Sequence, residues 1–135
     1  MHPPKDLLDR AIEAMGKAYA PYSNFRVGCA LRCSEGKIFS GCNVENASYG
    51  LTICAERVAV GAAVAQGAKK IVEAVIVTDT PAPTPPCGAC RQVLLEFSEN
   101  LKLWSVNLQG QGNCHTLEEL LPKAFGPKSL GFPKE

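Results

Sequence analysis

The sequence predicts a three-layer α/β/α sandwich built on a mixed five-stranded sheet whose last two strands are antiparallel. Strand and helix patterns alternate along the chain, which is typical of sheets covered by helices on both faces. The 135 residues are about the size of one domain, so we expect residues 1–135 to form a single domain. Gln109-Gly110-Gln111-Gly112, between the last two strands, is long enough for a hairpin but too short for a crossover between parallel strands.

The first half of the chain predicts a helix, a hairpin and a second helix. Apolar residues at steps of three and four predict a helix over 5–18. Short runs of strand-forming residues over 27–33 and 37–42, around a Ser-Glu-Gly turn, predict a hairpin. A second helical pattern follows Thr52 and continues to about Gln66, since the next residue is a glycine.

The second half predicts strands and helices that alternate until the closing hairpin. Runs of β-branched residues indicate buried strands. The only segment of biased composition is a Pro-rich loop over 80–86, after which the apolar spacing is again that of a helix. The last helix begins with a capping-box pattern. In order, the predicted elements are a strand over 71–77, a helix over 88–98, strands over 101–108 and 113–115, and a short helix opened by Thr116-Leu117-Glu118-Glu119.

Composition and charge exclude several classes of protein. A net charge of +1 leaves no basic surface large enough to hold a long nucleic acid. The longest mostly apolar stretch, 58–65, is far shorter than the roughly 20 residues of a membrane span. No secretory leader is recognisable, so we expect a cytoplasmic protein. Seven cysteines, an odd number, point to metal binding or catalysis rather than to a disulfide framework.

Two cysteine motifs lie at the starts of predicted helices. Cys87-Gly88-Ala89-Cys90 by itself is compatible with a redox dithiol, half of a structural zinc site or a coincidence. Cys54-Ala55-Glu56 opens the preceding helix, and the strand between the two helices brings their N-termini to the same edge of the sheet. We therefore expect Cys54, Cys87 and Cys90 to converge on one Zn²⁺ per chain. Three thiolates leave the fourth tetrahedral position open, as in catalytic zinc sites.

A water molecule on the open position of the metal needs a nearby group that carries its proton. The negative charge of three thiolates also needs a nearby positive charge to offset it. Glu56 is the candidate for the carrier, although a Glu in the first turn of a helix also suits the helix dipole alone. Arg57 and Gln92 are candidates for stabilising the thiolate sulfurs, and both also suit an ordinary surface position. We interpret His2, Cys114 and His115 as ordinary surface or packed residues.

Together these motifs resemble those of the zinc-dependent nucleoside and nucleobase deaminases. The sequence is most similar to the small homotetrameric, three-cysteine cytidine deaminases, over about residues 18–127. The matching blocks are Pro21-Tyr22-Ser23-Asn24-Phe25-Arg26-Val27-Gly28, Gly41-Cys42-Asn43-Val44-Glu45-Asn46-Ala47, Thr52-Ile53-Cys54-Ala55-Glu56-Arg57, Pro86-Cys87-Gly88-Ala89-Cys90-Arg91-Gln92, and Glu119-Leu120-Leu121-Pro122 with Phe125-Gly126-Pro127.

The resemblance implies roles that spacing alone does not. It implies that Asn43 and Glu45 bind the ribose hydroxyls, that Phe25 packs against the pyrimidine, and that the Ala55 N–H reads the base together with Glu56. Without the resemblance, residues 43–46 would be interpreted as a polar loop and Phe25 as core. The resemblance also implies that Ala47, Tyr49 and Phe125 approach the active sites of neighbouring subunits in a homotetramer.

Pro85 departs from the family pattern. Relatives commonly have Ser before the Pro-Cys pair, where this chain has Pro85. If the carbonyl of this residue holds the departing amine, Pro85 can still supply it, because proline lacks only the N–H.

We therefore expect a zinc-dependent hydrolase that deaminates cytidine and 2′-deoxycytidine in pyrimidine salvage. Zinc-bound hydroxide would attack C4 while Glu56 moves the protons. Two other enzymes are alternatives. One is a deaminase of a modified nucleoside. The other is a deaminase of bases in RNA or single-stranded DNA, an activity that the near-neutral charge and the closing hairpin disfavour. The third alternative is a non-catalytic structural zinc module.

Overall fold

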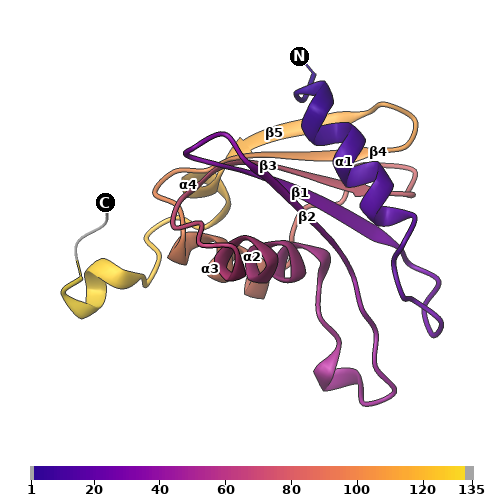
Figure 1. Ribbon diagram of the computed structural model, residues 1–135, viewed down its shortest axis with the longest axis horizontal. Helices are drawn as coiled ribbons and strands as arrows, with labels where there is room; N and C mark the ends of the chain where they lie inside the picture. Colours follow the sequence, from indigo (N-terminus) through magenta and orange to yellow (C-terminus); the bar gives the residue numbers. More distant parts are fainter. Residues whose placement is uncertain (1, 133–135) are drawn as a thin grey trace.

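The computed structural model describes residues 2–132 and contains a five-stranded mixed sheet between two helical layers (Figure 1). The strand order is β2-β1-β3-β4-β5, in which only the β3–β4 pair is parallel. The predicted fold class and the antiparallel last pair are confirmed. The elements are α1 (Lys5–Met15), β1 (Val27–Cys33), β2 (Ile38–Cys42), η1 (Tyr49–Leu51), α2 (Ala55–Ala65), β3 (Ile71–Thr78), α3 (Gly88–Glu96), β4 (Lys102–Asn107), β5 (Gly112–Thr116), α4 (Leu117–Leu120) and η2 (Pro127–Leu130).

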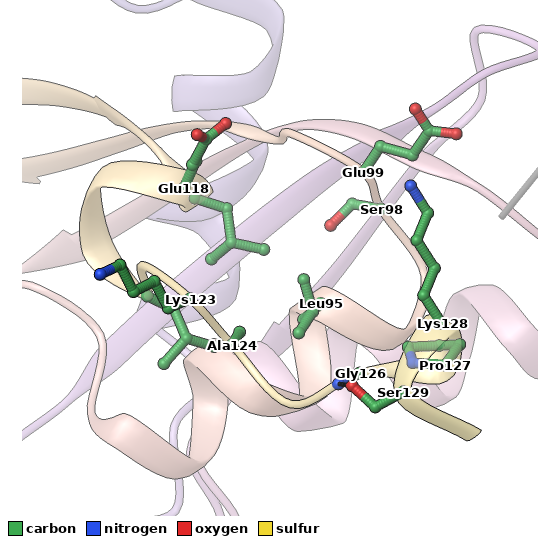
Figure 2. Close-up of a pocket in the computed structure, with 12 residues that line it drawn as sticks. Leu95, Ser98, Glu99, Glu118, Lys123, Ala124, Gly126, Pro127, Lys128 and Ser129 are labelled. Carbon is green, nitrogen blue, oxygen red and sulfur yellow. Dashed lines mark hydrogen bonds between the residues drawn. The ribbon is translucent and has the colours of Figure 1, made fainter. Parts of the chain in front are cut away.

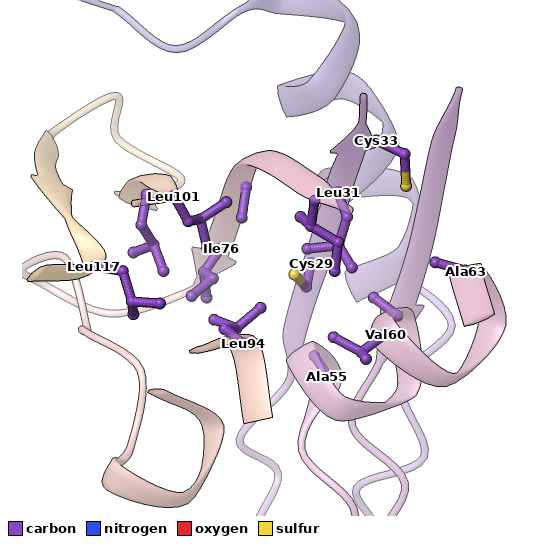
Figure 3. Close-up of a cluster of buried hydrophobic side chains, with 14 of the residues drawn as sticks. Cys29, Leu31, Cys33, Ala55, Val60, Ala63, Ile76, Leu94, Leu101 and Leu117 are labelled. Carbon is purple, nitrogen blue, oxygen red and sulfur yellow. The ribbon is translucent and has the colours of Figure 1, made fainter. Parts of the chain in front are cut away.

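Each face of the sheet buries its own hydrophobic cluster. In β1, Ala30 faces α1, whereas Cys29 and Leu31 face α2 and α3, as the alternation of side chains along a strand requires. Figure 3 shows the larger cluster, where Leu94 of α3 and Val60 of α2 lie over the sheet. This cluster fixes α2 and α3 side by side on one face.

Two glycines let a helix approach the sheet closely. A methyl group on Gly28 of β1 would lie 2.0 Å from the Ala11 carbonyl oxygen of α1. A methyl group on Gly41 of β2 would lie 2.5 Å from the Ala59 nitrogen of α2. Both distances are far inside van der Waals contact, so only glycine permits these helix positions.

Helices α1 and α2 are shorter than predicted because tertiary contacts replace helical ones. Helix α1 ends at Met15 rather than at residue 18, since Tyr19 N–H donates to the Asn43 carbonyl and draws the chain into a β-bridge with Val44. Helix α2 begins at Ala55, because Ile53 pairs with the same Val44. These bridges fasten the segment between β2 and α2 to the end of α1.

No helix in residues 2–132 has both the length and the apolar character needed to cross a bilayer.

Candidate metal centre and active site

Three thiols meet where α2 and α3 begin. Cys54 and Cys87 are the N-cap residues of the two helices, and Cys90 lies in the first turn of α3. The three sulfur atoms lie within 4.8 Å of one another. Four-coordinate Zn²⁺ with bonds of about 2.3 Å to sulfur places its sulfur ligands about 3.8 Å apart. The predicted convergence of the cysteines is therefore present in the fold.

The chemistry of these donors fits Zn²⁺. Thiolates are preferred zinc ligands, and no fourth His, Cys, Asp or Glu of the described chain joins the group within the same distance. Burial, followed by the Glu56 charge and the neighbouring cysteines, raises the pKa of the Cys90 thiol. A divalent cation removes this obstacle, because it replaces the thiol protons and offsets the negative charges.

The other four cysteines lie apart from this cluster. Cys29 and Cys33 are buried in the core beneath α2, and burial raises the pKa of both thiols. Cys42 and Cys114 are partly exposed and, like all the cysteines of the chain, are free thiols. Convergence thus distinguishes Cys54, Cys87 and Cys90 from the rest.

Arg57 lies beside the thiols, as its spacing from Cys54 predicts. Its Nη2 atom is 3.9 Å from the Cys54 sulfur and also donates to the Thr52 carbonyl at 3.3 Å. Its Nε is buried without a hydrogen-bond partner in the described residues. The guanidinium therefore supplies positive charge next to a group of thiolates.

Gln92 does not take the position expected of it. Its side-chain amide donates to the Phe125 carbonyl at 2.8 Å instead of to a cysteine sulfur. Gln92 lies on the exposed side of α3, and the C-terminal segment crosses there. Helical spacing from Cys90 gave no signal of this contact, since the partner lies 33 residues away in the sequence.

Glu56 is an almost fully buried carboxyl group beside the thiols. It is 5% exposed and follows Cys54 by two residues, in the first turn of α2. Burial raises the pKa of Glu56, and bonding to its own backbone N–H, to Cys90 and the charge of Arg57 oppose this only in part. A carboxyl group with a raised pKa exchanges protons more readily near neutral pH.

A cavity of about 270 Å³ opens over Glu56 and the thiols. Its walls include predicted site residues from three segments of the chain, namely Phe25, Asn43 with Glu45, and Ala55. Further wall residues were not among the predicted site residues; these are Val27, Thr52, Ile76, Thr78 and Thr84. Among these, only Thr84 has a signal in the sequence, because it immediately precedes Pro85.

Asn43 and Glu45 already hold the chain segment that carries Phe25. The Asn43 amide accepts from Val27 N–H at 2.9 Å and donates to the Phe25 carbonyl at 2.7 Å. The Glu45 carboxylate accepts from the backbone N–H groups of Tyr22 and Ser23 and from the Ser23 hydroxyl. The hydrogen bond from the Ser23 hydroxyl contributes most to the lowered pKa of Glu45. Both side chains therefore shape the cavity wall, and their remaining lone pairs and the second amide proton stay available to a ligand.

The residues that the resemblance assigned to neighbouring subunits do not line this cavity. Tyr49 is 76% exposed and Phe125 is 63% exposed. Ala47 is exposed as well, and the Tyr49 ring meets Tyr22 edge to face. In the single chain all three therefore face outward.

A second hollow lies away from the thiols, between the end of α3, α4 and η2 (Figure 2). Its walls combine apolar residues such as Leu95 with the charged Glu118 and Lys128. It contains none of the predicted site residues, in contrast to the cavity beside the thiols.

Comparison with known proteins identifies the family. A family model described as the cytidine and deoxycytidylate deaminase zinc-binding region matches residues 1–103. The chain belongs to this deaminase family. A cytidine deaminase of Halalkalibacterium halodurans is 49% identical over 125 residues, which are 92% of this chain and 95% of that protein. One of Mycobacterium tuberculosis is 40% identical over 129 residues, covering 96% and 92%.

Solved deaminase structures share the fold. The crystal structure of cytidine deaminase from Burkholderia pseudomallei superposes with a TM-score of 0.87 at 47% identity and covers 91% of this chain and 99% of its own. That from Mycobacterium tuberculosis gives 0.78 at 40% identity, with coverages of 90% and 95%. Family membership and the thiol cluster agree on Zn²⁺ as the cofactor of this deaminase.

Proposed function

We propose that this chain hydrolyses the C4 amino group of cytidine and 2′-deoxycytidine, giving uridine or deoxyuridine and ammonia. The observation that carries the proposal is the cluster of three thiols, two of which line one cavity together with the buried Glu56, Phe25 and Glu45. The names of the similar proteins, all cytidine deaminases, support the same substrate.

Cys54, Cys87 and Cys90 would hold one Zn²⁺. When bound, the metal supplies a water molecule of lowered pKa as the nucleophile for C4. Arg57 would offset the excess negative charge of three thiolates, because its guanidinium already lies 3.9 Å from the Cys54 sulfur.

Glu56 would carry the protons of the reaction. Its carboxylate takes a proton from the nucleophilic water and delivers it to N3 as C4 becomes tetrahedral. Glu56 then takes the proton of the hydroxyl group now on C4 and transfers it to the amine. The amine leaves as ammonia while the C4 carbonyl forms. The burial of Glu56 suits this work, since it favours the protonated state that the cycle has to pass through.

The rest of the cavity would orient the nucleoside. Asn43 and Glu45 would bind the sugar hydroxyls with the polar capacity left free by the loop, and the Phe25 ring would pack on the base. The backbone N–H of Ala55 would read the base edge beside Glu56. The Pro85 carbonyl would accept from the departing amine.

We also propose a homotetramer in which Ala47, Tyr49 and Phe125 complete the sites of neighbouring subunits. The large exposed aromatic rings of Tyr49 and Phe125 support this, because exposed apolar patches mark interaction surfaces. We further propose one domain over residues 1–135 and a role in pyrimidine salvage in the cytoplasm, a reducing compartment that suits free thiols.

An ultraviolet assay with cytidine, 2′-deoxycytidine, cytosine, adenosine and a cytosine-containing oligonucleotide tests the proposal. We expect turnover of the two cytidine nucleosides alone, dependent on zinc. Preferential deamination of the oligonucleotide, or no deamination of either nucleoside by protein that holds one zinc per chain, would overturn it.

A further inference from the structure

The Pro-rich loop 80–86 forms part of the cavity wall but has little backbone bonding of its own. Thr84 and Pro85 line the cavity, and the loop ends directly before Cys87. Four of its seven residues are prolines, which have no N–H to donate. In the described chain, side chains instead bond the carbonyl groups near its two ends, those of Thr80, Pro81, Ala82 and Pro86, so side chains help to decide where this wall lies.

Asn107 holds the start of the loop from outside the cavity. It lies at the end of β4, is 2% exposed, and pairs in register with Thr78 of the parallel strand β3. Its Nδ2 is 3.1 Å from both the Thr80 and Pro81 carbonyl oxygens and 2.8 Å from Gln111 Oε1. Its Oδ1 accepts from two backbone N–H groups of the β4–β5 turn. One buried amide thus joins the closing hairpin to the Pro-rich loop.

The Thr80 hydroxyl extends this connection to the cavity. It donates its one proton to the Ala82 carbonyl at 2.6 Å. Its contacts with the Thr78 and Thr84 hydroxyls, at 2.7 Å and 3.3 Å, then require Thr80 to accept both bonds. Thr78 and Thr84 both line the cavity, so their hydroxyls are oriented by Thr80.

The far end of the loop is held separately. Arg91 Nε donates to the Pro86 carbonyl at 2.9 Å, and its Nη1 donates to the Leu120 carbonyl of α4 at 2.8 Å. The residue before Cys87 is therefore fixed by α3 itself, independently of Asn107.

We propose that Asn107 is a positioning residue for the substrate. Through Thr80 and Pro81 it sets Thr84 and Pro85 against the bound nucleoside, while Arg91 keeps the metal ligand Cys87 in place. The inference rests on the proposed deamination of nucleosides. It assigns the closing hairpin a role in substrate affinity and none in metal binding.

Asn107→Asp removes the bonds from this residue to the loop carbonyls and keeps its bonds from the β4–β5 turn. A carboxylate can still accept from the turn N–H groups, but it cannot donate to the Thr80 and Pro81 carbonyls. We expect KM for cytidine to rise about tenfold, the effect of one or two lost hydrogen bonds, with kcat changed less than about twofold and one zinc retained. Thr80→Val should raise KM in the same direction. Gln111→Ala, the matched control, removes a bond from the same amide without touching the loop and should leave KM unchanged.

NMR signals of the Thr78 and Thr84 methyl groups give a second measurement that does not need activity. Asn107→Asp and Thr80→Val should shift both signals, because the Thr80 hydroxyl bonds both threonine hydroxyls, while the methyl signals of α1 stay in place. Unaltered KM in both variants of an enzyme that deaminates cytidine would overturn the proposal. If the wild type does not deaminate cytidine, the proposed function fails first, and unaltered Thr78 and Thr84 methyl signals would then refute the positioning role by themselves.

Discussion

At the scale of single residues, the site depends on where two helices begin. Cys54 and Cys87 occupy N-cap positions, where free backbone N–H groups and the helix dipole favour anionic sulfur. Glu56 follows in the first turn, so its carboxyl group reaches the same point from inside the helix. Burial then gives this carboxyl a raised pKa that an exposed first-turn Glu would not have.

Single replacement of each cysteine by Ser will separate metal ligands from other thiols. We expect Cys54→Ser, Cys87→Ser and Cys90→Ser to lose bound zinc, because a three-thiolate site has no ligand to spare. Cys42→Ser and Cys114→Ser, at partly exposed positions outside the cluster, should keep one zinc per chain. Metal analysis of the purified variants measures this, and loss of zinc in the last two with retention in Cys87→Ser would refute the assignment.

Glu56→Gln should keep the zinc and the fold but lose most of the turnover. The amide preserves size while it cannot accept and relay a proton, a function worth about 10²- to 10⁴-fold. Steady-state kinetics on zinc-loaded protein measures the loss. Asn43→Ala provides the contrast, since it should chiefly raise KM. A normal kcat in Glu56→Gln would show that Glu56 carries no proton in the reaction and only interacts favourably with the helix dipole.

At the scale of secondary-structure elements, the position of α2 on the sheet sets the depth of Cys54 and Glu56. Gly41 of β2 lies under Ala55 and Ala59, with no room for a side chain. Close contact at the first turn of α2 is thus built into the strand beneath it. A shift of this helix therefore moves Cys54 and Glu56 together.

Gly41→Ala should therefore weaken zinc binding as well as stability. Overpacking of this kind costs about 1–3 kcal/mol, and disturbed support of metal ligands costs about 10- to 100-fold in affinity. Chelator competition and thermal unfolding measure the two effects. Gly61→Ala is the control on the same helix, where a methyl group meets nothing within 4 Å, and it should raise stability by about 0.5–1 kcal/mol. Unchanged zinc affinity in Gly41→Ala would contradict this account.

At the scale of the whole molecule, the rings of Tyr49 and Phe125 are large apolar groups that are exposed in the single chain. Leu51 of η1 and Leu130 of η2 lie near these two rings in the sequence, and each is 65% exposed. Both 3-10 segments lie outside the sheet and its two helical layers (Figure 1). Assembly would cover these side chains, in line with the proposed homotetramer.

Light scattering at assay concentrations should give four times the chain mass of 14.4 kDa. Phe125→Ala should lower kcat/KM while each chain keeps its zinc, because the residue lies outside the metal cluster. An active monomer would refute the proposed link between assembly and catalysis.

The fold class and the convergence of Cys54, Cys87 and Cys90 could be predicted from the sequence because both depend on local patterns. Apolar spacing determines which segments become helices and strands, and a four-residue connection forces β4 and β5 to be antiparallel. Cys54 and Cys87 could be placed because a residue before a helical run caps it, and the intervening strand β3 brings the two caps together.

The remaining features were decided by tertiary structure alone. The end of α1 at Met15, the bond from Gln92 to the Phe125 carbonyl and the hold of Asn107 on the Pro-rich loop each join segments far apart in the sequence. Local spacing carries no signal for such contacts, since a polar group takes whichever partner the packed elements bring within about 3 Å. Local patterns in the sequence were therefore enough to bring the three thiols together, whereas the packing of distant segments set the shape of the cavity beside them.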